Sequence, residues 1–145
     1  MSTATESRLS FILTSKDSSF SGLLEHLCHD SVLHLLTTTG PSITLETVRS
    51  HSPEFVLLDL DSVEPAEASR LILKLALVSR AFVIITGMNS VAGNPSLDAF
   101  FQAGAHGTVV KPEGKTSLSL TGEPGKTYHK AISETVARLR KRRAS

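Results

Sequence analysis

Acidic, hydroxyl and amino side chains stand where several short apolar runs of the chain end. These chemically active residues are Lys16, Asp17, Asp59, Asp61, Thr86 and Lys111. If the apolar runs are parallel strands of one sheet, their carboxyl ends meet at a single edge, where ligands of such sheets bind. The spacing therefore predicts that carboxylates, a hydroxyl and an ammonium group converge on one site.

The predicted chemistry of this edge is the handling of a phosphoryl group. Like charges about 4 Å apart repel by roughly 4 kcal/mol at an effective dielectric of about 20, so neighbouring carboxylates need a cation or a raised pKa. Mg²⁺ takes one or two carboxylates together with water and phosphate oxygens, which suits Asp17 and Asp59. Lys111 would neutralise phosphate oxygens, and the Thr86 hydroxyl would donate a hydrogen bond to one.

The elements that position these residues follow from an alternation of short apolar runs with segments of helical spacing. Strands are predicted at 9–14, 32–36, within 53–62, 81–86 and 107–110. Helices are predicted at 20–27, 43–51, 65–77, 97–102 and 129–140. This alternation is typical of an α/β protein with a three-layer, doubly wound parallel sheet.

Composition indicates one soluble globular domain, because the 145 residues are 40% hydrophobic and 20% charged. Cys28 is the sole cysteine, the N-terminal segment lacks the apolar run of a secretory signal, and no stretch is long enough to span a bilayer. We therefore expect a cytoplasmic protein. Residues 1–7 and 141–145 are expected to be disordered, and residues 8–140 form the domain.

Four segments, in the right order, resemble the receiver domains of response regulators in two-component signalling. AGAHGTVVKP (103–112) resembles their fifth strand, PEFVLLDLD their third, FVIITG their fourth and KDSSF the start of their first helix. The stretch KPEG followed by serines is weakly similar to the receiver part of chemotaxis methylesterases. The resemblance covers residues 8–140 and implies a flavodoxin-like sheet with strand order 2-1-3-4-5 and five helices.

The resemblance also implies residue roles. Asp59 would accept a phosphoryl group from a histidine kinase or phosphotransfer protein, with Thr86 and Lys111 on that group. Asp17, Asp59 and the backbone carbonyl of Asp61 would hold Mg²⁺. The expected role is a phosphorelay module rather than an enzyme, acting on a downstream protein or on an output domain outside this chain. The sequence leaves homodimerisation open.

Several departures from the family pattern bear on these roles. The acidic pair after the first strand is here Lys16-Asp17, or Ser15-Lys16 if the register shifts by one residue, and either pair weakens Mg²⁺ binding. The loop LDSVEPAEAS lacks the family's Met-Pro and Asp-Gly, the loop GMNSVAGNP is longer than usual, and Thr108 replaces an aromatic residue. The alternative function is a degenerate receiver that acts as a phosphorylation-independent protein-interaction module.

Two further classes are disfavoured. No glycine-rich phosphate loop follows the first strand, which argues against a flavodoxin-like enzyme. The run RLRKRR (138–143) carries enough charge to bind nucleic acid, but cations at a helix C-terminus also complement the helix dipole. We favour the helix-end interpretation and regard nucleic acid as an unlikely partner.

Overall fold

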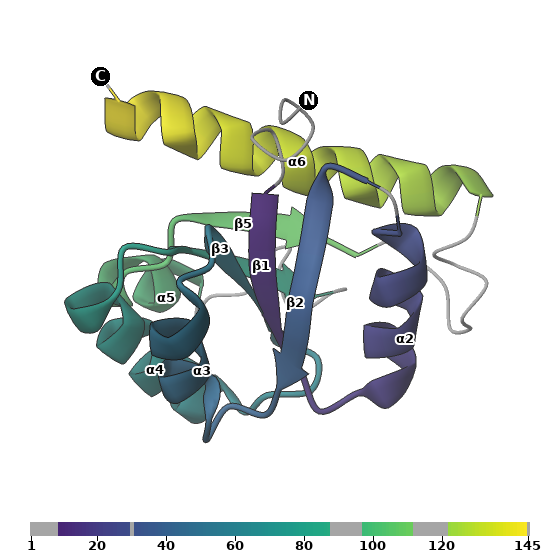
Figure 1. Cartoon of the computed structure of the whole chain (residues 1–145). Coiled ribbons are helices and arrows are strands. Elements are labelled where there is room, and N and C mark those ends of the chain that lie inside the picture. The colour runs from purple at the N-terminus through teal and green to yellow at the C-terminus, as the bar shows by residue number, and fades with distance from the viewer. Residues whose placement is uncertain (1–8, 30, 88–96, 112–121, 145) are drawn as a thin grey trace.

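A five-stranded parallel sheet lies between two layers of helices (Figure 1) in the computed structural model, which describes residues 9–29, 31–87, 97–111 and 122–144. The strands are β1 (Leu9–Thr14), β2 (Leu33–Thr39), β3 (Phe55–Asp59), β4 (Phe82–Gly87) and β5 (Gly107–Val110). Their order is β2-β1-β3-β4-β5, with every neighbouring pair parallel. The predicted fold class and strand order are confirmed.

Helices cover both faces of the sheet. They are α2 (Ser18–Leu27), α3 (Thr44–His51), α4 (Pro65–Val78), α5 (Leu97–Ala103) and α6 (Gly122–Ala144). Helices α2 and α6 pack on one face, and α3, α4 and α5 pack on the other (Figure 1). The carboxyl ends of the strands are therefore left accessible to loops rather than covered by a helix body.

Strand β3 is buried on both faces, which explains its unbroken apolar run. Phe55 and Leu57 belong to the cluster beneath α2 and α6, whereas Val56 and Leu58 belong to the cluster beneath α3, α4 and α5. Side chains alternate between faces along a strand, so a central parallel strand needs apolar residues at every position. The Phe55 ring also stacks on that of Phe11, with ring centroids 4.7 Å apart.

Local chemistry explains where two of these elements begin or end. Helix α4 begins at Pro65, whose fixed φ and missing N–H suit the first turn of a helix. Strand β2 continues to Thr39 rather than ending at residue 36, because its β-branched threonines favour an extended backbone.

The last helix is longer than predicted at both ends. Helix α6 starts at Gly122 rather than 129, and residues 141–144 continue it instead of forming the predicted disordered tail. Lysine and arginine are good helix formers, and their charges are stabilised by the C-terminal end of the helix dipole. Arg143 also holds this end to the domain, because its Nη1 donates to the Arg80 carbonyl at 2.6 Å.

The turn from α5 to β5 requires glycine. Gly104 has φ of +130°, and a Cβ built there would lie 2.6 Å from the Cβ of Ala76 on α4. The AGA motif that marks this segment is thus explained by a close approach of two helices as well as by backbone conformation.

The remaining predictions concern residues outside the described part of the chain. They are the disorder of residues 1–7, the long loop beyond Gly87 and the connection over residues 112–121. Among the described helices, none combines the length and the apolar character needed to cross a membrane.

Candidate functional site

Asp59, the last residue of β3, is fully buried and accepts hydrogen bonds from four donors. Its Oδ2 accepts from the hydroxyls of Ser15 at 2.8 Å and Ser62 at 3.0 Å. Its Oδ1 accepts from the backbone N–H of Asp61 at 3.1 Å and from Lys111 Nζ at 2.7 Å. Such a set compensates for the large cost of removing a carboxylate from water.

Lys111 joins the two carboxylates that the sequence places after β3. Its ammonium lies 2.7 Å from Asp59 Oδ1 and 3.1 Å from Asp61 Oδ2, and its side chain is 10% exposed. The same ammonium lies 3.8 Å from the ring centroid of Phe20 on α2, within cation–π range. The predicted convergence of Asp59, Asp61 and Lys111 is therefore found.

The β1 edge follows the alternative register, with Ser15 rather than a carboxylate beside Asp59. The next residue, Lys16, donates its backbone N–H to Ser62 Oγ at 2.9 Å. Its ammonium reaches Glu67 Oε1 at 3.4 Å, and the side chain is 51% exposed. Hence the positions of the expected acidic pair carry a hydroxyl and a cation, and the Lys16 ammonium does not contact Asp59.

Asp17 does not join this set, contrary to the predicted convergence with Asp59. Its Oδ1 accepts the backbone N–H groups of Ser19 at 3.0 Å and Phe20 at 3.3 Å, so it is the N-cap of α2. The first N–H groups of a helix lack partners within the helix, and an aspartate at the N-cap satisfies them.

The oxygen donors at this edge do not fit Mg²⁺. Among the described residues, the carboxylates that meet at this edge are those of Asp59 and Asp61, and they already share the Lys111 ammonium. Ser15 and Lys16 stand where further acidic ligands would be needed, and the described residues contain no group of three or more acidic, histidine or cysteine side chains able to hold a metal. A magnesium ion would have to displace Lys111 from both carboxylates.

Thr86 lies next to Asp59 in the register of β4 and β3 and is fully buried. Its Oγ1 donates its single proton to the Val109 carbonyl at 2.8 Å. The Tyr128 hydroxyl, 2.6 Å from the same Oγ1, must therefore be the donor in their hydrogen bond. Burial is the main cause that raises the pKa of the Tyr128 phenol, which keeps this proton in place.

Tyr128 is the site residue that the sequence reading missed. It lies on α6 in a segment predicted to be a loop, and it brings an aromatic hydroxyl to Thr86 although Thr108 replaces the aromatic residue of strand five. Its ring also lies 6.3 Å from that of Phe20, which contacts Lys111. The signal was the spacing of Tyr128 from Ile132 and Val136, which puts all three on one buried helix face.

Comparisons with known proteins support the fold. No protein-family model matches the chain, and no curated protein sequence is significantly similar to it. Solved structures do match. The response-regulator domain of Thermotoga maritima CheB is 14% identical, with a TM-score of 0.67, covering 88% of this chain and 96% of that one. The receiver domain of a putative Luxo repressor protein from Vibrio parahaemolyticus is 14% identical, with a TM-score of 0.69 and coverage of 94% and 96%.

A third solved structure also matches over most of the chain at low sequence identity. The receiver domain of the putative response regulator NarL from Mycobacterium tuberculosis is 14% identical, with a TM-score of 0.61, covering 88% of this chain and 97% of that one. The chain thus has the fold of response-regulator receiver domains, as its sequence motifs indicate. At this identity the likeness establishes the fold, whereas the site has to be interpreted from its own residues.

Proposed function

We propose that this chain is a degenerate, non-enzymatic receiver domain that acts in signal transduction as a protein-interaction module, without accepting a phosphoryl group on Asp59. One observation carries the proposal: the Asp59 carboxylate is fully buried and held by four donors, while Ser15 and Lys16 stand at the β1 edge.

The chemistry of phosphoryl transfer explains why this observation matters. Transfer needs a nucleophilic oxygen in line with the leaving group and cations on the equatorial oxygens of the phosphoryl group. Both Asp59 oxygens are already engaged, and neither lies at the surface. Lys111 supplies one positive charge, and that charge is shared between two carboxylates.

A partner surface is available on the side of the sheet away from α2 and α6. Large apolar side chains are exposed on α4 and α5, which contact each other, and exposed apolar residues on neighbouring elements support a protein contact. These residues are Leu73, Leu77, Val78 and Phe101.

The second candidate function is phosphoryl acceptance on Asp59 from a histidine kinase or phosphotransfer protein. It is favoured by the position of Asp59 at the end of β3, with Lys111 at 2.7 Å and Thr86 as its neighbour on β4. The Asp59 carboxylate would attack the phosphoramidate in line, and the phosphoryl group would pass from the histidine nitrogen to the carboxylate oxygen. A downstream protein or an output domain would then read the modified state.

Incubation with acetyl phosphate and Mg²⁺, followed promptly by intact mass spectrometry, separates the two functions. The first candidate predicts no added phosphoryl group on the unaltered chain. A phosphoryl adduct that is absent from an Asp59→Asn variant would establish the second candidate instead. Asp61→Asn is the matched control, because it changes the neighbouring carboxylate and leaves Asp59 in place.

A further inference from the structure

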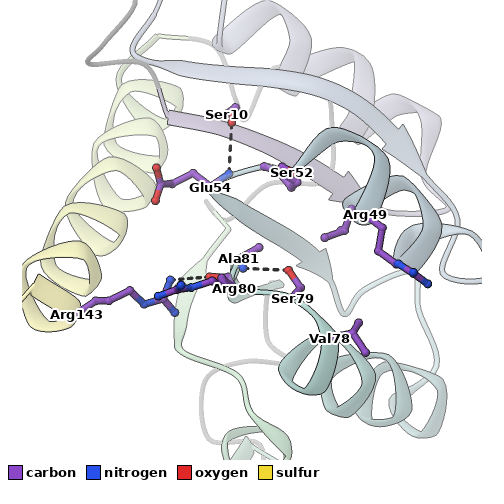
Figure 2. A pocket seen from close by; sticks show the side chains of 11 residues that line it. Ser10, Arg49, Ser52, Glu54, Val78, Ser79, Arg80, Ala81 and Arg143 are labelled. Carbon is purple, nitrogen blue, oxygen red and sulfur yellow. Dashed lines mark hydrogen bonds between the residues drawn. The ribbon is translucent and has the colours of Figure 1, made fainter.

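A polar cavity lies at the opposite edge of the sheet, where the strands begin. It has a volume of about 570 Å³ and is lined by residues that precede β3, by the turn from α4 to β4, and by parts of β1, α3 and α6 (Figure 2). This volume is within the range of about 300–1,000 Å³ that small-molecule sites occupy. Neither the fold comparison nor the Asp59 site accounts for it.

Arginine is the characteristic residue of this cavity. Arg49, Arg80 and Arg143 all line it. Figure 2 shows Arg143 reaching from α6 to the backbone of Arg80, where its Nη1 donates to the carbonyl at 2.6 Å. Its guanidinium carbon also lies 4.0 Å from the ring centroid of Phe82. The Arg143 guanidinium is thus held in a defined position, with further N–H donors left for another acceptor.

The cavity has more positive than negative charge. Among the described residues that line it, Glu54 is the acidic one, and its Oε2 lies 3.9 Å from Arg140 Nε. Within the described part of the chain, no carboxylate pairs with any of the three lining arginines. The C-terminal ends of α3 and α4 contribute about −0.5 charge each, which leaves an excess of about two positive charges once Arg140 is included.

Serine hydroxyls add neutral donors. Ser10 Oγ accepts the backbone N–H of Glu54 at 3.3 Å, and Ser79 Oγ accepts that of Ala81 at 3.0 Å, as the dashed lines in Figure 2 mark. Because each hydroxyl accepts in these bonds, its own proton is available to donate to a ligand oxygen.

We propose that this cavity binds a phosphate-bearing small molecule, with Arg80 and Arg143 contacting the phosphate oxygens and the serine hydroxyls donating to them. Guanidinium groups bind phosphate through paired N–H donors, and hydrogen bonds to a charged acceptor are roughly twice as strong as neutral ones. The ligand would sit at the opposite end of β3 and β4 from Asp59, so this site is separate from the one on which the proposed function rests.

Titration with inorganic pyrophosphate and with adenosine 5′-monophosphate, followed by amide NMR shifts, tests the proposal. Saturable shifts are expected at Ser79, Ala81 and Glu54. Arg80→Gln should weaken binding about tenfold or more, the loss expected for one charged hydrogen bond. This variant keeps the Arg80 carbonyl, and hence the anchor of Arg143 and the end of α6.

The matched control is Arg138→Gln, which alters an exposed arginine of α6 that does not line the cavity. It should leave the affinity unchanged. If neither probe gives saturable shifts at millimolar concentration, the cavity is not a phosphate site. If Arg138→Gln weakens binding as much as Arg80→Gln does, the anion binds diffusely to the basic helix and the proposal is wrong.

Discussion

Replacement of Asp59 by asparagine distinguishes a structural carboxylate from a reactive one. In this protein the Asp59 charge is the nearest partner of a lysine whose side chain is 10% exposed. Asparagine has nearly the same shape, and the hydroxyls of Ser15 and Ser62 can rotate to accept from its amide. What the substitution removes is the negative charge opposite Lys111.

The expected loss in the free energy of unfolding is large, but smaller than the loss for a buried charge left without any partner. Removing one partner of a buried ion pair destabilises a protein by about 3–5 kcal/mol. Asp61, at 3.1 Å from Lys111, keeps part of the compensation, so we expect Asp59→Asn to lower the free energy of unfolding by about 3 kcal/mol. The melting temperature should fall by about 10 °C in a domain of this size.

Equilibrium unfolding in urea measures this effect. Asp61→Asn is the control, because its side chain is 29% exposed and its loss should cost less than about 1 kcal/mol. Reactive groups are commonly held at the expense of stability, so their removal often stabilises the fold. If Asp59→Asn leaves the free energy of unfolding unchanged or raises it, the structural role assigned to Asp59 is wrong.

Three further predictions concern the Tyr128–Thr86 hydrogen bond, the pKa of His106 and the turn at Gly104. Tyr128→Phe should lower the free energy of unfolding by about 1 kcal/mol, and a double-mutant cycle with Thr86→Val should show coupling between the two hydroxyls; additive effects would contradict their hydrogen bond. Burial, and then the charge of Arg143, lowers the pKa of His106 from 6.5, so the folded state binds this proton less readily than the unfolded state. The stability that neutral His106 contributes is therefore present above about pH 6.5 and lost as the pH falls through the folded pKa, and His106→Asn should flatten that part of the urea-unfolding profile. Gly104→Ala should cost about 2 kcal/mol, because the new Cβ meets Ala76 where φ is positive; thermal unfolding should show partial recovery when Ala76→Gly is added.

Strand and helix positions were predictable where neighbouring residues decide them. The apolar run of β3 and the proline that opens α4 carry their own structural signal. Because the strands are parallel, the convergence of Asp59 and Lys111 also followed from topology alone. Helix α6 is longer than the sequence pattern predicts, because Pro124 and Gly125 are typical of a loop although proline is tolerated in a first helical turn.

The identity of the residue beside Asp59 could not be read from the sequence. An aspartate after β1 is equally typical of a metal ligand and of a helix N-cap, and one residue of register decides whether Lys16-Asp17 or Ser15-Lys16 occupies the pair of positions near Asp59. That register depends on how the loop to α2 packs against Ser62, which is a tertiary interaction. Tyr128 was missed for a related reason, because its partner Thr86 is 42 residues away in the chain.

Our central claim is that Asp59 is held as a structural carboxylate because Ser15 and Lys16 stand at the β1 edge, where an acidic pair would be needed. Amide NMR shifts on addition of beryllofluoride and Mg²⁺ test it most directly, with a Ser15→Asp/Lys16→Asp variant that rebuilds the acidic pair. We expect no saturable change around Asp59 in the unaltered chain and a Mg²⁺-dependent change in the variant. A saturable, Mg²⁺-dependent change in the unaltered chain that Asp59→Asn abolishes would contradict it.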